Sequence, residues 1–100
     1  MTKRDWTEPR AKVDSEDDQC RVCRQRPAEA AHIIPRSRVS AGPGEGQLNI
    51  VPLCRGHHQA FDAHRFDILP YLTRAEQSNA VALVGMVEAM RRITGSRLAA

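Results

Sequence analysis

The chain has 100 residues, with 15 Lys and Arg against 12 Asp and Glu, and its sequence pI is about 9.1. This mild positive charge permits a nucleic-acid partner without requiring one. The length suits one small domain, and aromatic residues make up only 4% of it, so a thin, mostly aliphatic core is expected. No run is long and apolar enough to cross a bilayer, and we expect no membrane partner.

The three cysteines cannot all pair within one chain. The N-terminal residues do not resemble a secretory signal. Disulfides are rare in reducing compartments, where a pattern of cysteines more often binds metal. We therefore expect a cytoplasmic protein whose cysteines serve as thiolate ligands.

The first predicted element is a short polar helix over 7–16, with Thr7 as its cap and Pro9 in its first turn. The middle of the chain then reads as a series of short elements with candidate ligands at the joints. They are a turn over 20–26, a strand over 29–34 that stops at Pro35, an irregular loop over 36–47, a strand over 48–53 and a helix over 55–64.

The C-terminal part predicts one helix over 74–94. Thr73 and Glu76 have the spacing of a capping box, and Gly95 supplies a stop. Apolar residues follow at steps of three and four, as on one helical face; they are Ala80, Leu83, Val84, Val87, Met90 and Ile93. We expect this helix to cover the sheet and core rather than to form a dedicated partner interface.

Two ligand pairs bracket the predicted strands. Cys20 and Cys23 are separated by two residues, and Cys54 and His57 repeat that spacing, so together they can complete a tetrahedral zinc site. His58 is adjacent to His57 and points elsewhere, because neighbours on a helix differ by about 100°. The alternatives are free buried cysteines, or a redox pair that would leave Cys54 unexplained.

Three segments carry a resemblance to a known family: A-H-I-I-P-R-S at 31–37, N-I-V-P-L-C at 49–54, and the C-x2-H-H that follows. Over about residues 18–66 the chain resembles the zinc-containing HNH endonucleases of phages and prophages. The resemblance implies an α+β fold with a ββα-metal (His-Me finger) core and a structural zinc. With the predicted helices on either side, we expect one nuclease domain over 1–100, with helical extensions at 1–17 and 67–100 flanking the core.

The resemblance assigns roles to three residues of this core. His32 would be the general base, since an imidazole can take a proton from water near neutral pH. Asn49 would tie the loop backbone and help to aim the histidine. His58 would bind a catalytic divalent metal, Mg²⁺, Mn²⁺ or Ni²⁺, that stabilises charge on the scissile phosphate.

One position departs from the family pattern. Many HNH proteins have a metal ligand immediately before the catalytic histidine, where this chain has Ala31. Asp62 is four residues after His58, on the same helical face, and is our candidate replacement. Its alternatives are a solvated carboxylate or a pair with Arg65. We expect His64 to face away from His58 at the surface.

Arginines follow both strands, and the resemblance implies a double-stranded DNA partner. Arg36, Arg38 and Arg55 are the expected phosphate contacts, which position a duplex without reading its sequence; the alternative is that they are solvated surface arginines. The function that the resemblance implies is metal-dependent hydrolysis of DNA, by nicking or double-strand cleavage. The alternative is a catalytically degenerate, zinc-stabilised nucleic-acid-binding or adaptor module. The resemblance further suggests a phage terminase as partner and a host-cell cytoplasmic location, and cutting both strands at once would need a homodimer.

Overall fold

Short strands and helices are joined by long turns in the computed structural model, which describes residues 9–38 and 46–95. The predicted cap Thr7 lies outside these ranges. In chain order the elements are α1 (Pro9–Ser15), β1 (Glu29–His32), β2 (Ile50–Leu53), α2 (Arg55–Asp62), α3 (Arg74–Val84) and α4 (Met86–Thr94). This order confirms the α+β prediction. No helix in the described ranges has the length and hydropathy needed to cross a membrane.

Strands β1 and β2 form a two-stranded antiparallel sheet in which Glu29 is opposite Leu53 and His32 is opposite Ile50. Both strands are shorter than predicted. After His32 the chain stays beside the second strand, where the Ile33 amide donates to the Asn49 carbonyl at 2.8 Å, but regular pairing ends. The ββ unit was therefore correctly predicted, with boundaries that differ by two residues.

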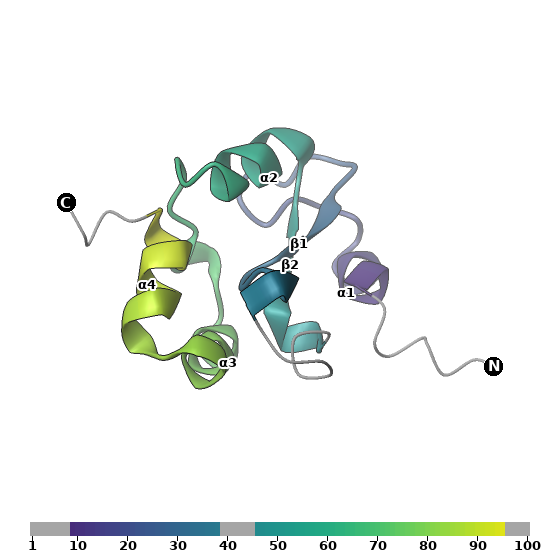
Figure 1. Cartoon of the computed structure of the whole chain (residues 1–100). Coiled ribbons are helices and arrows are strands. Elements are labelled where there is room, and N and C mark those ends of the chain that lie inside the picture. The colour runs from purple at the N-terminus through teal and green to yellow at the C-terminus, as the bar shows by residue number, and fades with distance from the viewer. Residues whose placement is uncertain (1–8, 39–45, 96–100) are drawn as a thin grey trace.

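Helices surround this hairpin: α1 lies on one side, α3 and α4 lie on the other, and α2 crosses near one end (Figure 1). A continuous core joins the two strands with α2, α3 and α4, because each of these elements contributes apolar side chains to it. The fully or almost fully buried members include Ile33, Ile34, Val51, Leu53, Phe61, Ile68, Ala80, Ala89 and Ile93. The C-terminal helices thus cover the core, as expected.

The prediction of one continuous helix over 74–94 is wrong, because the chain turns at Gly85. This residue has φ 89° and ψ 162°, which interrupt the helical conformation and suit glycine. Its amide closes α3 on Val81 at 2.7 Å, and its carbonyl accepts from Ala89 at the start of α4. The turn lets α4 fold back onto α3, so that Ala80 and Ala89 reach the same core. The predicted capping box at Thr73 and stop at Gly95 are both present.

A buried ion-pair network connects three distant segments. The side chain of Glu76 is 2% exposed and contacts Arg21 at 2.6 Å and Lys12 at 2.9 Å. Lys12 also donates to the carbonyls of Gln47 and Ile50, which precede and begin β2. Burying charges is tolerated here because each one is paired and hydrogen-bonded. The network fixes α1 and α3 against the turn that carries the first two cysteines.

The predicted loop over 36–47 contains a 3-10 turn at Arg36–Arg38 and the start of another at Gln47–Asn49. The part of the loop between 39 and 45 lies outside the described residues. Leu48 belongs to the second of these turns rather than to the predicted strand. The two turns flank the sheet and place Arg36 and Asn49 beside the end of β1.

Candidate active site and zinc site

Four predicted ligands meet where the turn after α1 approaches the start of α2. The ligand atoms of Cys20, Cys23, Cys54 and His57 all lie within 4.8 Å of one another. The Cys23 and Cys54 sulfurs are 3.8 Å apart, and His57 Nδ1 lies 3.5 Å from the Cys20 sulfur and 3.2 Å from the Cys54 sulfur. Tetrahedral zinc with Zn–S bonds of about 2.3 Å places its sulfurs about 3.8 Å apart. The cluster therefore fits zinc binding.

Local backbone groups prepare this cluster for a metal. Burial alone would raise the pKa of the Cys20 thiol, but the backbone N–H groups of Cys23, Cys54 and Val22 stabilise the thiolate and lower the pKa to about 6. A thiolate is the form that binds zinc. His57 contributes Nδ1 to the cluster, and the neighbouring His58 lies outside it, as the helical spacing predicts.

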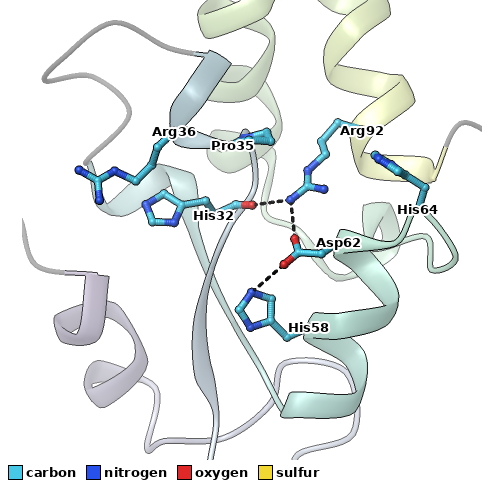
Figure 2. A pocket seen from close by; sticks show the side chains of 7 residues that line it. All are labelled: His32, Pro35, Arg36, His58, Asp62, His64 and Arg92. Carbon is cyan, nitrogen blue, oxygen red and sulfur yellow. Dashed lines mark hydrogen bonds and ion pairs between the residues drawn. The ribbon is translucent and has the colours of Figure 1, made fainter.

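A second group of polar residues lines an open cleft of about 490 Å³ on the other side of α2. His32 approaches it from the end of β1, His58 and Asp62 from α2, and Arg92 from α4 (Figure 2). Pro35, Arg36 and His64 complete its lining. The cleft therefore brings the predicted base together with the two predicted ligands of the catalytic metal.

His58 lies between two carboxylates. Its Nε2 is 3.3 Å from Asp62 Oδ2, and its Nδ1 is 2.8 Å from Glu29 Oε1. Glu29 also contacts Arg55 at 3.2 Å. The contact with His58 lowers the pKa of Glu29, desolvation opposes the shift, and Arg55 adds to it. An ionised carboxylate can only accept a hydrogen bond, so Nδ1 is the donor to Glu29. The other ring nitrogen, Nε2, faces Asp62.

Glu29 was missed in the sequence as a part of this site. It precedes Ala31 by two residues, and side chains two apart on a strand point to the same face. Ala31 itself is fully buried and belongs to the same core as Phe61 of α2. The strand thus has a carboxylate that contacts His58 of α2, at Glu29. This is two residues before Ala31, the position at which many HNH proteins have a metal ligand. The period of the strand was the signal that could have identified it.

Asn49 holds the chain that follows β1. Its side-chain amide accepts from the Ile34 N–H at 2.9 Å and donates to the Ile34 carbonyl at 3.0 Å. The residue is fully buried, and both polar ends of its amide are hydrogen-bonded. These contacts hold the backbone two residues after His32, and the role of Asn49 in aiming that histidine stays a prediction.

Two cleft residues depart from the expectations. Helix α2 ends at Asp62, so His64 is not on the helix; it is exposed, as expected, but it lines the same cleft as His58. Arg92 was not considered at all, because the C-terminal helix was treated as a cover. Arg92 Nη2 donates to Asp62 Oδ1 at 2.9 Å, and Asp62 therefore pairs with Arg92 rather than with Arg65.

The three predicted phosphate contacts differ in their surroundings. Arg36 lines the cleft. Arg38 makes a two-bond ion pair with Glu88 of α4 at 2.6 and 2.7 Å. Arg55 is 78% exposed and contacts Glu29. Arg36 is thus the one of these three arginines that the structure brings to the cleft.

Comparison with known proteins agrees with this geometry. A family model described as HNH endonuclease matches residues 20–68. The matched segment runs from the first cysteine of the zinc cluster past the end of α2, and it contains His32, Asn49 and His58. No curated protein and no solved structure gives a match. Residues 20–68, the zinc-cluster ββα part of the chain, belong to the HNH endonuclease family.

Proposed function

We propose that the chain is a metal-dependent endonuclease that hydrolyses phosphodiester bonds of double-stranded DNA. The observation that carries this proposal is the meeting of His32, His58 and Asp62 in one open cleft beside the zinc cluster. Membership of the HNH family supports a nucleic-acid substrate. The zinc cluster has a structural role in this proposal, because its four ligand residues leave no position open for substrate.

The donor atoms of the cleft fit a catalytic divalent ion. Two ligand atoms in neighbouring positions on an ion at about 2.1 Å lie about 3 Å apart. The 3.3 Å between His58 Nε2 and Asp62 Oδ2 is close to that separation. These two residues would hold the ion, and the ion would supply Lewis-acid stabilisation of charge on the phosphate. One nitrogen and one carboxylate oxygen favour Mn²⁺ or Ni²⁺ over Mg²⁺, which prefers oxygen ligands.

His32 would take the proton of the attacking water. Its Nε2 atom is buried, whereas the ring lines the cleft, so Nδ1 is the nitrogen that we propose as the base. The Asn49 contacts with Ile34 hold the backbone next to it. A general base placed in this way contributes about 10²–10⁴ to the rate.

Glu29 and the arginines complete the proposal. Glu29 would orient His58 by accepting from Nδ1, as carboxylates do for many metal-binding histidines. Arg36 would contact a DNA phosphate from the cleft wall, with Arg38 and Arg55 as further contacts once they exchange their carboxylate partners for phosphates. A single site cuts one strand, so a nick is the expected first product. A second cut would need a homodimer or a second event, and a phage terminase is the proposed larger partner.

The alternative function is a nucleic-acid-binding or adaptor module without catalysis. It is favoured by one observation, the buried Ala31 at a position where the family often has a ligand. The test incubates zinc-loaded protein with supercoiled plasmid in Mg²⁺, Mn²⁺ or Ni²⁺, and in buffer without any of the three metals. An endonuclease converts the plasmid to the nicked form only when one of these metals is added. An adaptor shifts the mobility of DNA and leaves every plasmid intact in all three metals.

A further inference from the structure

Arg92 lies in α4, beyond the segment that matches the HNH family, yet its guanidinium enters the cleft (Figure 2). Its Nε donates to the Ile33 carbonyl at 2.9 Å, and its Nη2 donates to the His32 carbonyl at 3.1 Å and to Asp62 Oδ1 at 2.9 Å. The side chain is only 10% exposed. One residue thus contacts both the strand that carries the proposed base and the helix that carries the proposed ligands.

The contact restrains Asp62 in particular. This carboxylate is 55% exposed and belongs to the last residue of α2, where a side chain has little packing to fix it. Because Oδ1 is held by Arg92, Oδ2 is the oxygen turned toward His58 Nε2. Arg92 is itself held by a cation–π contact, with its guanidinium carbon 4.0 Å from the centre of the Phe61 ring.

The contact also restrains the strand end. His32 is the last residue of β1 and Ile33 is the first residue beyond it, so Arg92 contacts the backbone at the point where the strand ends. The Arg92 guanidinium is only a hydrogen-bond donor, and its N–H groups have a fixed planar geometry. It can therefore donate to two carbonyls and a carboxylate at once. A lysine in its place could satisfy only part of this set.

We propose that Arg92 is a positioning residue of the nuclease reaction and that α4 is part of the catalytic unit. The inference rests on the proposed function. Arg92 sets the orientation in which Asp62 offers Oδ2 to the metal and fixes the backbone from which His32 projects. It acts through these two residues, and it is not a phosphate contact.

The test compares Arg92→Lys with Arg91→Lys, a matched change at the exposed neighbour on the same helix. Both keep the charge, so a difference between them reflects hydrogen-bond geometry. We expect Arg92→Lys to retain zinc and to lose tenfold or more in kcat for plasmid nicking at saturating Mn²⁺, with KM for DNA unchanged. Its affinity for Mn²⁺ without DNA, measured by electron paramagnetic resonance, should fall about tenfold, as is typical when a partner of a metal ligand is lost. Arg91→Lys should match the wild type in every measurement.

The proposal is overturned if Arg92→Lys nicks plasmid at the wild-type rate, or if KM rises while kcat is unchanged, which would make Arg92 a DNA contact. It is also overturned if activity falls only in proportion to lost zinc and lost folded protein. The wild type provides a measurement that needs no substitution: scalar coupling across a hydrogen bond from Arg92 Nε–H to the Ile33 carbonyl. Its absence from the NMR spectrum refutes the contact. A wild type that cuts no plasmid refutes the proposed function instead, and the Mn²⁺ titration then decides the role of Arg92 alone.

Discussion

Replacing Glu29 with Ala should weaken binding of the catalytic metal while leaving the zinc cluster and the fold in place. Glu29 Oε1 accepts from His58 Nδ1 at 2.8 Å, which ties the His58 ring to β1. Losing it frees the imidazole to rotate and removes a carboxylate that makes Nε2 a better ligand.

The size of the effect follows from the contact. A hydrogen bond to a charged group contributes about 1.5–3 kcal/mol when it is shielded from water. The Glu29 side chain is 38% exposed, so solvent screening reduces its contribution. A contribution of about 1.4 kcal/mol corresponds to a tenfold weaker affinity. Glu29→Gln keeps an acceptor for Nδ1 without the charge, and its expected loss is smaller, about threefold.

The assay titrates Mn²⁺ into zinc-loaded protein without DNA and follows free Mn²⁺ by electron paramagnetic resonance. Gln59→Ala, an exposed change on α2, is the control and should bind Mn²⁺ like the wild type. The order of affinity should be wild type, then Glu29→Gln, then Glu29→Ala. An alanine variant with wild-type affinity would show that Glu29 forms only a surface ion pair with Arg55 and does not orient His58.

Three further changes test other parts of the structure. Cys54→Ser or removal of zinc should unfold the chain, because structural zinc contributes about 10 kcal/mol or more to folding in small domains; circular dichroism before and after chelation checks this, and a folded zinc-free protein contradicts it. Glu76→Gln should lower the free energy of unfolding by about 3 kcal/mol at pH 7, against less than about 1 for the more exposed Glu16→Gln. Burial raises the pKa of Glu76, but hydrogen bonds to its carboxylate lower it more, so this stability is present above the ordinary glutamate pKa and is lost as pH falls through the lowered value. Urea titrations from pH 7 down to the lowest pH at which both proteins keep their zinc should therefore show the Glu76→Gln deficit shrinking, and a constant deficit would refute the assignment. Asp62→Ala should keep its zinc but bind no Mn²⁺ at concentrations that load the wild type, counted by native mass spectrometry; a retained Mn²⁺ would demote Asp62 to a surface carboxylate.

The features that were predictable from the sequence are those set by short-range spacing. Cys54 and His57 are one helical turn apart, and His58 and Asp62 are four residues apart, so the helix alone decides which of them share a side. The first strand was recognisable as a short apolar run that stops at Pro35, and the second as a short apolar run between a Gly-rich loop and Cys54. Thr73 forms its capping box with a residue of the same helical turn, which is again a local interaction.

The missed features depend on tertiary contacts. Glu29 and His58 are 29 residues apart, and Arg92 and His32 are 60 apart, so no local pattern connects them. Gly85 lies inside the predicted helix over 74–94, and an isolated glycine costs a helix only about 1 kcal/mol, so it does not by itself predict a break. The apolar spacing around it fits one long helix as well as two short ones. The bend is favoured by a tertiary interaction: with the bend, Ala89 of α4 and Ala80 of α3 are buried in the same core.

The central claim is that His32 is the base of a DNA-hydrolysing site, and single-turnover nicking of supercoiled plasmid tests it most directly. Wild type, His32→Ala and the control Gln59→Ala are compared in Mn²⁺ at equal zinc content, with DNA binding of each zinc-loaded protein measured by fluorescence anisotropy without added Mn²⁺. We predict that His32→Ala binds DNA like the wild type and nicks it about 10²–10⁴ times more slowly, while Gln59→Ala is unaffected. A His32→Ala protein that nicks plasmid as fast as the wild type in the same metal would contradict the account.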